Sequence, residues 1–310
     1  CIDTEFGVLM FYTNTVFTIG DDQSKAYQLI GKNLDELIEE AKDKFYILVQ
    51  NYANLTVEDM VLDGTNLDKW SATDGDSYVL SNNSGNVNVT GTTKIIANTD
   101  GDLAFALDAC YNPSYTAPVV TLGENVTVQG KVEVTGGQLY TNAALQAVVK
   151  KTVEGSETGW GTLSSPTAEG IVAFSTSEGH DFYQYVESED LEWDYIGGNF
   201  NSYTMTVGRG YLYANEATTE VSFEGTLNHQ DVEFPLSYSY TVDGEPKDLA
   251  GFNFIGNPFT HNITAAHLSG NKTEGYYVFT TMTCEPSLPA ELERIAGITE
   301  GVLRIMVIRK

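Results

Sequence analysis

Short apolar runs separated by glycines follow one another closely between residues 86 and 149. Valine, isoleucine and phenylalanine in runs of this length predict short β-strands, and glycine permits the tight turns between them. From Val126 to Leu139 the runs recur at a spacing of about six residues. This spacing predicts a parallel β-solenoid with short rungs, and a β-sandwich of short hairpins is the alternative. The apolar pairs are Val87/Val89, Ile95/Ile96, Leu103/Phe105, Val119/Val120, Val126/Val128 and Val132/Val134.

Residues 150–283 have a different β pattern, in which aromatic and apolar residues alternate with polar ones. A period of two, with turn residues about every 8–12 positions, predicts an antiparallel β-sandwich. Because many of the alternating residues are aromatic, we expect one inner face to be aromatic. The alternating sets are Tyr183/Tyr185, Tyr203/Met205/Val207, Tyr211/Tyr213, Val221/Phe223, Val232/Phe234 and Tyr238/Tyr240.

The two ends of the chain carry short α/β elements. Near the N-terminus we expect a strand over residues 7–18, then a helix capped by Asn33, then a buried strand over residues 45–49. Near the C-terminus, Pro289 and Gly297 bound a short predicted helix, which a closing strand follows.

A polar, turn-rich stretch over residues 61–82 is the predicted junction between the N-terminal segment and the β-rich part. The chain is therefore predicted to be mainly β, with small α/β elements at both termini. The predicted domains are an α/β segment over 1–60, a short-strand, solenoid-like region over 61–149, an antiparallel β-sandwich over 150–283, and a helix–strand tail over 284–310 that is a candidate to pack against the first segment.

The chain is strongly acidic: its 310 residues include 43 Asp and Glu against 16 Lys and Arg, a formal net charge of −27. A broad surface for nucleic acid or an anionic membrane needs clustered basic residues, which this composition excludes. No stretch approaches the roughly 18 consecutive apolar residues of a transmembrane helix. We therefore expect no nucleic-acid partner and no membrane span.

The three cysteines, Cys1, Cys110 and Cys284, are too far apart in sequence for a CxxC redox or zinc motif. Three unrelated thiols are the simplest interpretation, and a disulfide between Cys110 and Cys284 is the alternative. Cys1 is a candidate site for a lipid anchor, because a lipoprotein begins with its lipid-bearing cysteine once the signal is cleaved. A truncated chain would begin in the same way.

No set of residues predicts a catalytic centre. Although His180 and Asp181 lie near Ser175 in the sequence, no strained Gly-x-Ser-x-Gly turn accompanies them. We therefore predict that the protein is not an enzyme. The histidines lack the spacing of zinc ligands, and we expect polar surface residues at His180, His229, His261 and His267.

Two Asp-Gly-Asp turns are the candidates for a cofactor, a calcium ion. Asp74 and Asp76 flank one glycine, and Asp100 and Asp102 flank another. Carboxylate oxygens on a tight turn suit a hard cation, although neither turn has the full pattern of an EF-hand. Ordinary Asp-Gly turns without a metal are the alternative interpretation.

Trp193 and Tyr195 follow an acidic run that extends from Glu187 to Glu192. Aromatic rings stack on the apolar face of a pyranose, so Trp193, Tyr195 and Glu192, together with Trp160, are candidate glycan-binding residues. A solvated acidic loop is the alternative. Glycoside hydrolysis would require a set separation between two carboxylates.

A series of glycine-rich motifs occurs between Gly137 and Thr264: Gly137-Gln-Leu-Tyr140 before Ala147-Val-Val-Lys-Lys151, then Gly159-Trp-Gly-Thr-Leu-Ser-Ser-Pro166, Gly208-Arg-Gly-Tyr-Leu-Tyr-Ala-Asn215, Val221-Ser-Phe-Glu-Gly-Thr-Leu227 and Gly251-Phe-Asn-Phe-Ile-Gly-Asn-Pro-Phe259. In this order the motifs resemble β-rich surface proteins of gut and oral Bacteroidetes, which are secreted or attached to the outer membrane. The resemblance implies structural modules and no catalytic residues.

The last 36 residues or so carry a second set of motifs: Glu274-Gly-Tyr-Tyr-Val-Phe279, Pro289-Ala-Glu-Leu-Glu-Arg294, Ile298-Thr-Glu-Gly-Val-Leu-Arg304 and Met306-Val-Ile-Arg-Lys310. They resemble the C-terminal half of bacterial ribosomal protein S6. That family has a ferredoxin-like fold and binds ribosomal RNA with a partner protein. The resemblance implies a local β-α-β shape for the tail, and the acidic body has no counterpart in such a protein.

These observations favour a non-catalytic structural or adhesin-like protein that binds glycans or proteins. An acidic surface keeps a secreted protein soluble, and tyrosine-rich strands suit a binding surface. We expect an extracellular or cell-surface location, with a lipid anchor as one option. The alternatives are a carbohydrate-active or carbohydrate-binding module and, for the tail alone, an S6-like protein associated with RNA.

Overall fold

The prediction of a mainly β chain is confirmed. The chain divides into two compact units, Cys1–Asn262 and Ile263–Lys310, and every described element of the first unit is a strand. The second unit contributes one 3₁₀ turn, Ala265–His267. None of the described helices is both long and apolar enough to cross a membrane. The computed structural model describes residues 9–19, 27–28, 47–65, 78–97, 103–107, 116–156, 159–176, 179–189, 193–197, 203–239, 241–242, 245–246 and 250–269.

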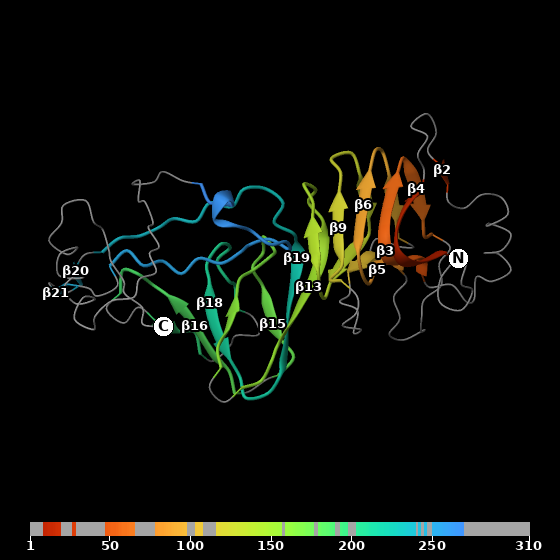
Figure 1. The fold of residues 1–310 in the computed structure, drawn as a ribbon. Helices are drawn as coiled ribbons and strands as arrows, with labels where there is room; N and C mark the ends of the chain where they lie inside the picture. Colours follow the sequence, from red (N-terminus) through yellow and green to blue (C-terminus); the bar gives the residue numbers. More distant parts are fainter. Residues whose placement is uncertain are drawn as a thin grey trace, which may run out of the picture. The chain divides into compact units, whose positions relative to one another are not determined.

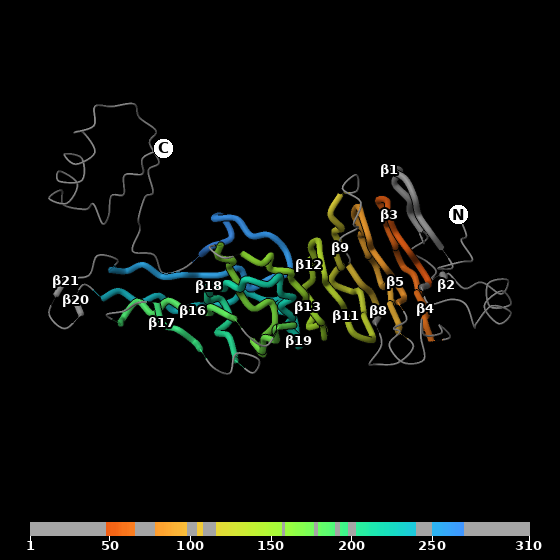
Figure 2. The backbone as a smooth tube through the Cα atoms, turned by 90° about the horizontal axis from the view of Figure 1, so that it is seen from below, coloured from red at the N-terminus to blue at the C-terminus, as the bar shows by residue number. Residues whose placement is uncertain are grey.

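Parallel strands make up the first half of the chain, where the backbone winds in successive coils that stack on one another (Figure 1, Figure 2). Each complete coil adds strands to three rows. The first row contains the N-terminal half of β3 (Ile47–Glu58), β5 (Tyr78–Asn82), β8 (Leu103–Leu107) and β11 (Lys131–Val134). The second contains the C-terminal half of β3, β6 (Asn86–Thr90), β9 (Val119–Leu122) and β12 (Gln138–Tyr140). The third contains β2 (Tyr27–Gln28), β4 (Met60–Asp63), β7 (Lys94–Ile96) and β10 (Thr127–Gln129), and β1 (Leu9–Ile19) pairs with β3.

The core of this parallel part consists of residues that stack from one coil to the next. Leu55 pairs with Val87, Val87 with Val120, and Val120 with Leu139. All four side chains are buried. The first two steps span 32 and 33 residues and the third spans 19, so a residue's neighbour in the core is one whole coil away.

The register shows what the sequence spacing of about six residues corresponds to in the structure. Val128, Val132 and Leu139 lie on β10, β11 and β12, which belong to three different rows. The six-residue spacing is therefore the distance from one side of a coil to the next side, because a corner separates each pair of strands. It is not the distance between stacked strands.

Asparagine and glycine shape the corner between the first two rows. Asn51 and Asn82 are fully buried, and the Asn51 side-chain amide donates to the Asn82 Oδ1 at 2.9 Å. Gly85 follows at a φ of 75°, a conformation that glycine adopts without steric cost. An amide both donates and accepts hydrogen bonds, so one residue type links coil to coil without leaving a buried polar group unpaired.

The strand β13 (Gln146–Val153) joins the parallel part to an antiparallel part. Its first half pairs in parallel with β11, whereas its full length pairs antiparallel with β19 (Thr219–Thr226). On the far side of β19 lies β15 (Val172–Phe174). A second antiparallel sheet has the order β14 (Gly161–Leu163), β18 (Tyr211–Ala214), β16 (Asp181–Tyr185) and β17 (Trp193–Tyr195), and a short pair joins β20 (Thr241–Val242) to β21 (Glu245–Pro246).

Side chains from both antiparallel sheets share one core. The strands that carry them include β15, β16, β18 and β19, which are labelled in Figure 1. The expectation of an aromatic inner face is confirmed, since phenylalanine and tyrosine rings form its largest members. The buried members are Leu163, Val172, Phe174, Phe182, Met205, Tyr211, Tyr213, Val221 and Phe223.

The predicted strand sets of two segments do not form strands among the described residues. Residues 203–210 make only isolated bridges and a turn, and residues 231–239 have no ladder. Side-chain bonds hold the second segment instead: Asn253 accepts from the Ser237 N–H at 3.1 Å and its Nδ2 donates to the Ser237 carbonyl at 2.9 Å. Alternation alone therefore does not identify a strand where an amide side chain takes the place of a neighbouring strand.

The predicted strand over residues 7–18 corresponds to β1, and the predicted strand over 45–49 begins at Ile47 and continues to Glu58. The stretch 61–82 carries β4 and β5, whose Leu62, Val79 and Leu80 belong to the same core as β3. The helix after Asn33, the tail beyond residue 269 and its packing against residues 1–60 lie outside the described residues.

Candidate functional site

The strongest candidate site is the outer face of the four-stranded antiparallel sheet. Because side chains alternate along a strand, β16 places Phe182 in the core and Tyr183 on the opposite face. The register with β17 pairs Tyr183 with Tyr195 and Tyr185 with Trp193. These four residues and Trp160, which precedes β14, are called the aromatic face below.

Ring contacts divide this row of residues into two groups on one face of the sheet. In the first group, the ring centroids of Trp160 and Tyr183 are 5.7 Å apart, and those of Tyr183 and Tyr195 are 5.1 Å apart. The second group is the neighbouring register pair, Tyr185 and Trp193, whose centroids are 5.2 Å apart. These distances are typical of favourable aromatic pairs.

Three members of the row are open to solvent. The exposed fractions are 51% for Trp160, 53% for Tyr195 and 38% for Trp193. Large aromatic rings are seldom left exposed in a contiguous group unless the group binds something. The structure thus brings together three of the predicted ligand-binding residues, whereas the fourth, Glu192, lies outside the described residues.

The row includes residues that sequence reasoning did not select. The alternation of Tyr183 and Tyr185 was a usable signal for them, because both must face away from Phe182. Phe252 and Phe254 also pack on this end of the sheet, with centroids 4.9 Å from Tyr185 and 5.6 Å from Trp193. The residues around Phe252 and Phe254 in the sequence do not indicate that these two rings pack against β16 and β17.

A buried carboxylate anchors the segment that carries these phenylalanines. The Glu187 Oε1 accepts from the Ser239 N–H at 2.6 Å and from the Gly251 N–H at 2.9 Å. Burial raises the pKa of Glu187, but hydrogen bonds from Gly251, Ser239 and Ser237 outweigh burial and leave the pKa below its usual value. The expectation of a solvated acidic loop is therefore wrong for Glu187, which is buried.

Arg209 stiffens the same region from the inner side. Its Nη1 donates to the Tyr185 carbonyl at 3.0 Å, and its guanidinium lies 5.6 Å from the Phe234 ring centroid. Gln184 donates to the Asp194 Oδ2 at 2.8 Å, which ties β16 to β17. A rigid support reduces the conformational entropy that the protein's side chains lose when a ligand binds.

His180 is buried, so the expectation of a surface histidine is wrong at this position. Its Nδ1 lies 2.6 Å from the Tyr213 hydroxyl and its Nε2 lies 3.0 Å from the Thr176 carbonyl. Burial lowers the pKa of His180, and the bond to Thr176 offsets only part of this effect. The imidazole is therefore neutral at pH 7 and belongs to the polar edge of the core.

Ser175, which lies near His180 and Asp181 in the sequence, hydrogen-bonds to the neighbouring strand β19. The Ser175 hydroxyl accepts from the Glu220 N–H at 2.9 Å, and Asp181 is exposed. His180 makes its contacts with Thr176 and Tyr213 instead.

Several other predicted sites are not described by the structure. No group of three or more metal-ligating side chains occurs among the described residues. The predicted calcium ligands Asp74, Asp76, Asp100 and Asp102, and the cysteines Cys1, Cys110 and Cys284, lie outside them.

Comparison with known proteins finds similarity at the C-terminus. The family model of ribosomal protein S6 matches residues 261–309, which confirms the resemblance of the tail and extends it toward the N-terminus. Small ribosomal subunit protein bS6 of Clostridium perfringens (strain SM101 / Type A) is 43% identical over 37 residues, which cover 12% of this chain and 39% of the relative. The corresponding protein of Thermoanaerobacter pseudethanolicus is 46% identical over 44 residues, which cover 14% and 46%.

The chain thus spans less than half the length of the curated relatives it matches. The match begins at residue 261, so the resemblance of residues 137–264 to Bacteroidetes surface proteins stays a prediction. No solved structure matches the chain.

Proposed function

We propose that the protein is a non-catalytic, adhesin-like binding protein of the cell surface or extracellular space, and that the aromatic face binds glycans. In this proposal residues 47–140 form a β-solenoid that serves as a rigid stalk. The two antiparallel sheets of residues 146–227 form a β-sandwich that displays the aromatic face. The carrying observation is that Trp160, Tyr195 and Trp193 are exposed and lie with Tyr183 and Tyr185 on one face of the sheet.

The solenoid assignment is supported by the coil-to-coil stacking of Leu55, Val87 and Val120 in parallel register. The sandwich assignment is supported by the core that both antiparallel sheets share. The surface setting is supported by the resemblance of the glycine-rich motifs and by the net charge of −27.

A neutral glycan fits the aromatic face better than an acidic one. The apolar face of a pyranose covers an exposed ring, and its hydroxyls keep their contact with water at the rim. The strong negative charge of the chain repels a long polyanion at distances up to the screening length. We therefore expect oligosaccharides of uncharged hexoses or pentoses to be the preferred ligands.

The test is binding of the full chain to an array of neutral oligosaccharides, followed by titration of the best ligand. We expect Trp160→Ala and Tyr195→Ala each to weaken binding roughly fivefold, because one stacked ring contributes about 1 kcal/mol. Ile171→Ala is the control, since this apolar side chain is 51% exposed but lies beside β15 in the other antiparallel sheet, outside the aromatic face. Unchanged affinity in both aromatic-face variants would refute the proposal, and release of free sugar would favour the carbohydrate-active alternative.

The S6-like segment supports a second candidate function, association of the tail with RNA. The match to residues 261–309 motivates it. Over residues 263–310 five Lys and Arg balance five Glu, so the tail does not share the acidity of the rest. We expect the full chain to bind a fragment of small-subunit ribosomal RNA at about 50 mM salt and to lose most of this binding at about 200 mM. An absence of binding at the lower salt would remove this candidate.

A further inference from the structure

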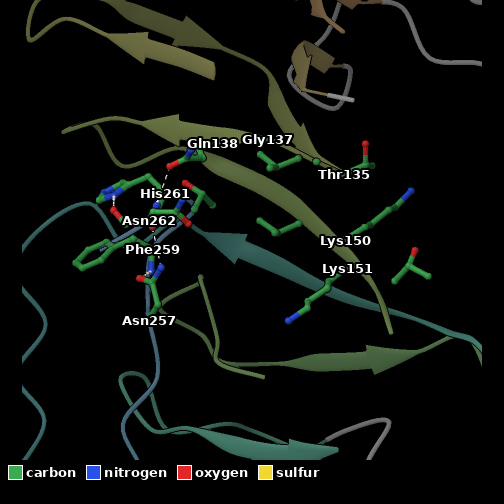
Figure 3. A pocket seen from close by; sticks show the side chains of 14 residues that line it. Thr135, Gly137, Gln138, Lys150, Lys151, Asn257, Phe259, His261 and Asn262 are labelled. Atoms are coloured by element: carbon green, nitrogen blue, oxygen red, sulfur yellow. Dashed lines mark hydrogen bonds between the residues drawn. The ribbon is translucent and has the colours of Figure 1, made fainter. Parts of the chain in front are cut away.

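A cavity lies where the corner between β11 and β12, the strand β13 and the segment 257–262 meet (Figure 3). Its volume is about 430 Å³, within the range of small-molecule sites. A neighbouring hollow of about 380 Å³ shares Val149, Lys151, Asn257, Phe259 and Thr260 with the cavity. The polar and aromatic residues that matter here are Gln138, Lys151, Asn257, Phe259, His261 and Asn262.

Lys151 lines the cavity, and no carboxylate of the described residues balances its charge, whereas its neighbour on β13, Lys150, is paired. Lys131 pairs with Glu224 at 2.9 Å and Lys150 with Glu133 at 3.2 Å. Within the part of the chain that the structure describes, no carboxylate lies at ion-pair distance from the Lys151 ammonium. That ammonium donates instead to the Thr162 carbonyl at 2.9 Å.

The ammonium of Lys151 retains the capacity to bind a ligand. An ammonium has three N–H donors, and the Thr162 carbonyl takes one of them. In Figure 3 the Lys151 side chain extends toward the segment that carries Asn257, whereas Lys150 extends away from it. Partial burial lowers the pKa of Lys151, as expected for a cation that lacks an anionic partner.

Two stacked rings, those of Phe259 and His261, form one wall of the cavity, and Tyr140 supports His261 from outside the lining. His261 lies between Tyr140, at 4.4 Å and 12°, and Phe259, at 5.2 Å and 8°. Backbone and amide bonds clamp this wall to β12: the Leu139 N–H donates to the Thr260 carbonyl at 3.1 Å, and the Asn262 N–H donates to the Gln138 Oε1 at 2.9 Å. A cavity with a fixed wall is preorganised for a ligand.

We propose that this cavity binds a single carboxylated sugar, with the Lys151 ammonium donating to the carboxylate and the ring wall contacting the body of the sugar. The site is separate from the aromatic face and takes a different ligand class. A charge-assisted bond to a carboxylate is among the stronger hydrogen bonds that a protein makes. Because the rest of the chain is strongly acidic, the site suits one isolated acidic unit and disfavours a polyanion.

The experiment is a ligand-observed NMR titration of the full chain with methyl β-D-glucuronide and, in parallel, with methyl β-D-glucoside. The two probes differ at one carboxylate. We expect the glucuronide to bind at least fivefold more tightly, Lys151→Gln to abolish this preference, and Lys151→Arg to retain it. Lys131→Gln is the matched control, since it makes the same charge change outside the cavity and is expected to alter the preference less than twofold.

Two results would overturn the proposal. One is equal affinity of the wild-type chain for the two probes. The other is an equal loss of preference in Lys151→Gln and Lys131→Gln, which would indicate a general charge effect. Trp160→Ala separates this site from the aromatic face: we expect its glucuronide affinity to be unchanged, and a loss there would assign the acidic sugar to the aromatic face instead.

Discussion

Replacing Gly85 with alanine is expected to destabilise the protein by roughly 3 kcal/mol. A Cβ at this position would lie 2.2 Å from the Ala53 carbonyl oxygen and 2.7 Å from its carbon, in the coil beneath. The backbone φ of 75° adds a cost of about 1 kcal/mol for any residue other than glycine. The corner would have to open, which would strain the bond from the Val119 N–H to the Gly85 carbonyl in the next coil.

Urea denaturation followed by circular dichroism measures this cost. Gly179→Ala is the matched control, because Gly179 has a φ of 79° but a Cβ there would meet nothing closer than 3.6 Å. The control is expected to lose about 1 kcal/mol, which is the backbone part alone. Equal losses in the two variants would mean that contact between coils does not constrain the corner.

Replacing Asn51 with alanine is expected to cost about 3 kcal/mol, since several buried polar groups would lose their partner at once. The Asn51 Nδ2 lies within hydrogen-bond distance of the Ala53 carbonyl at 2.7 Å, the Asn82 Oδ1 at 2.9 Å and the Ser84 carbonyl at 3.1 Å. Its Oδ1 accepts from the Ala53 N–H at 3.2 Å. The side chain is fully buried, so water cannot replace these bonds without a cavity opening.

The same denaturation experiment tests this prediction. Asn88→Ala is the control: Asn88 lies on β6 and its side chain is exposed, so its replacement is expected to change the free energy of unfolding by less than about 0.5 kcal/mol. Similar losses for Asn51→Ala and Asn88→Ala would show that the amide link between coils adds nothing beyond strand propensity.

Local features of the chain were sufficient to predict many of its strands and the faces of several of them. A strand turns successive side chains to opposite sides, so the alternation around Phe182 already assigned Tyr183 and Tyr185 to one face. Aromatic residues beside an acidic run then predicted Trp193 and Tyr195 as ligand residues. Each of these inferences depends on neighbours within a few positions.

Patterns among neighbouring residues could not predict which strands stack on one another in successive coils. The partner of Leu55 is Val87, and the partner of Val120 is Leu139, although the two separations differ. Corners of variable length lie between the strands, so no fixed sequence period marks the register. The spacing of about six residues from Val126 onward is therefore the distance between neighbouring sides of a coil, and it does not give the stacking register.

Whether a polar residue is buried also depends on parts of the chain that are distant in sequence. Glu187 stands in an acidic run and His180 beside an aspartate, and both look like surface residues in sequence. Glu187 is covered by the segment that brings Ser239 and Gly251, and His180 by Tyr213. Alternation along the chain sets which way a side chain points, but the free energy of its burial depends on which remote segment packs over it.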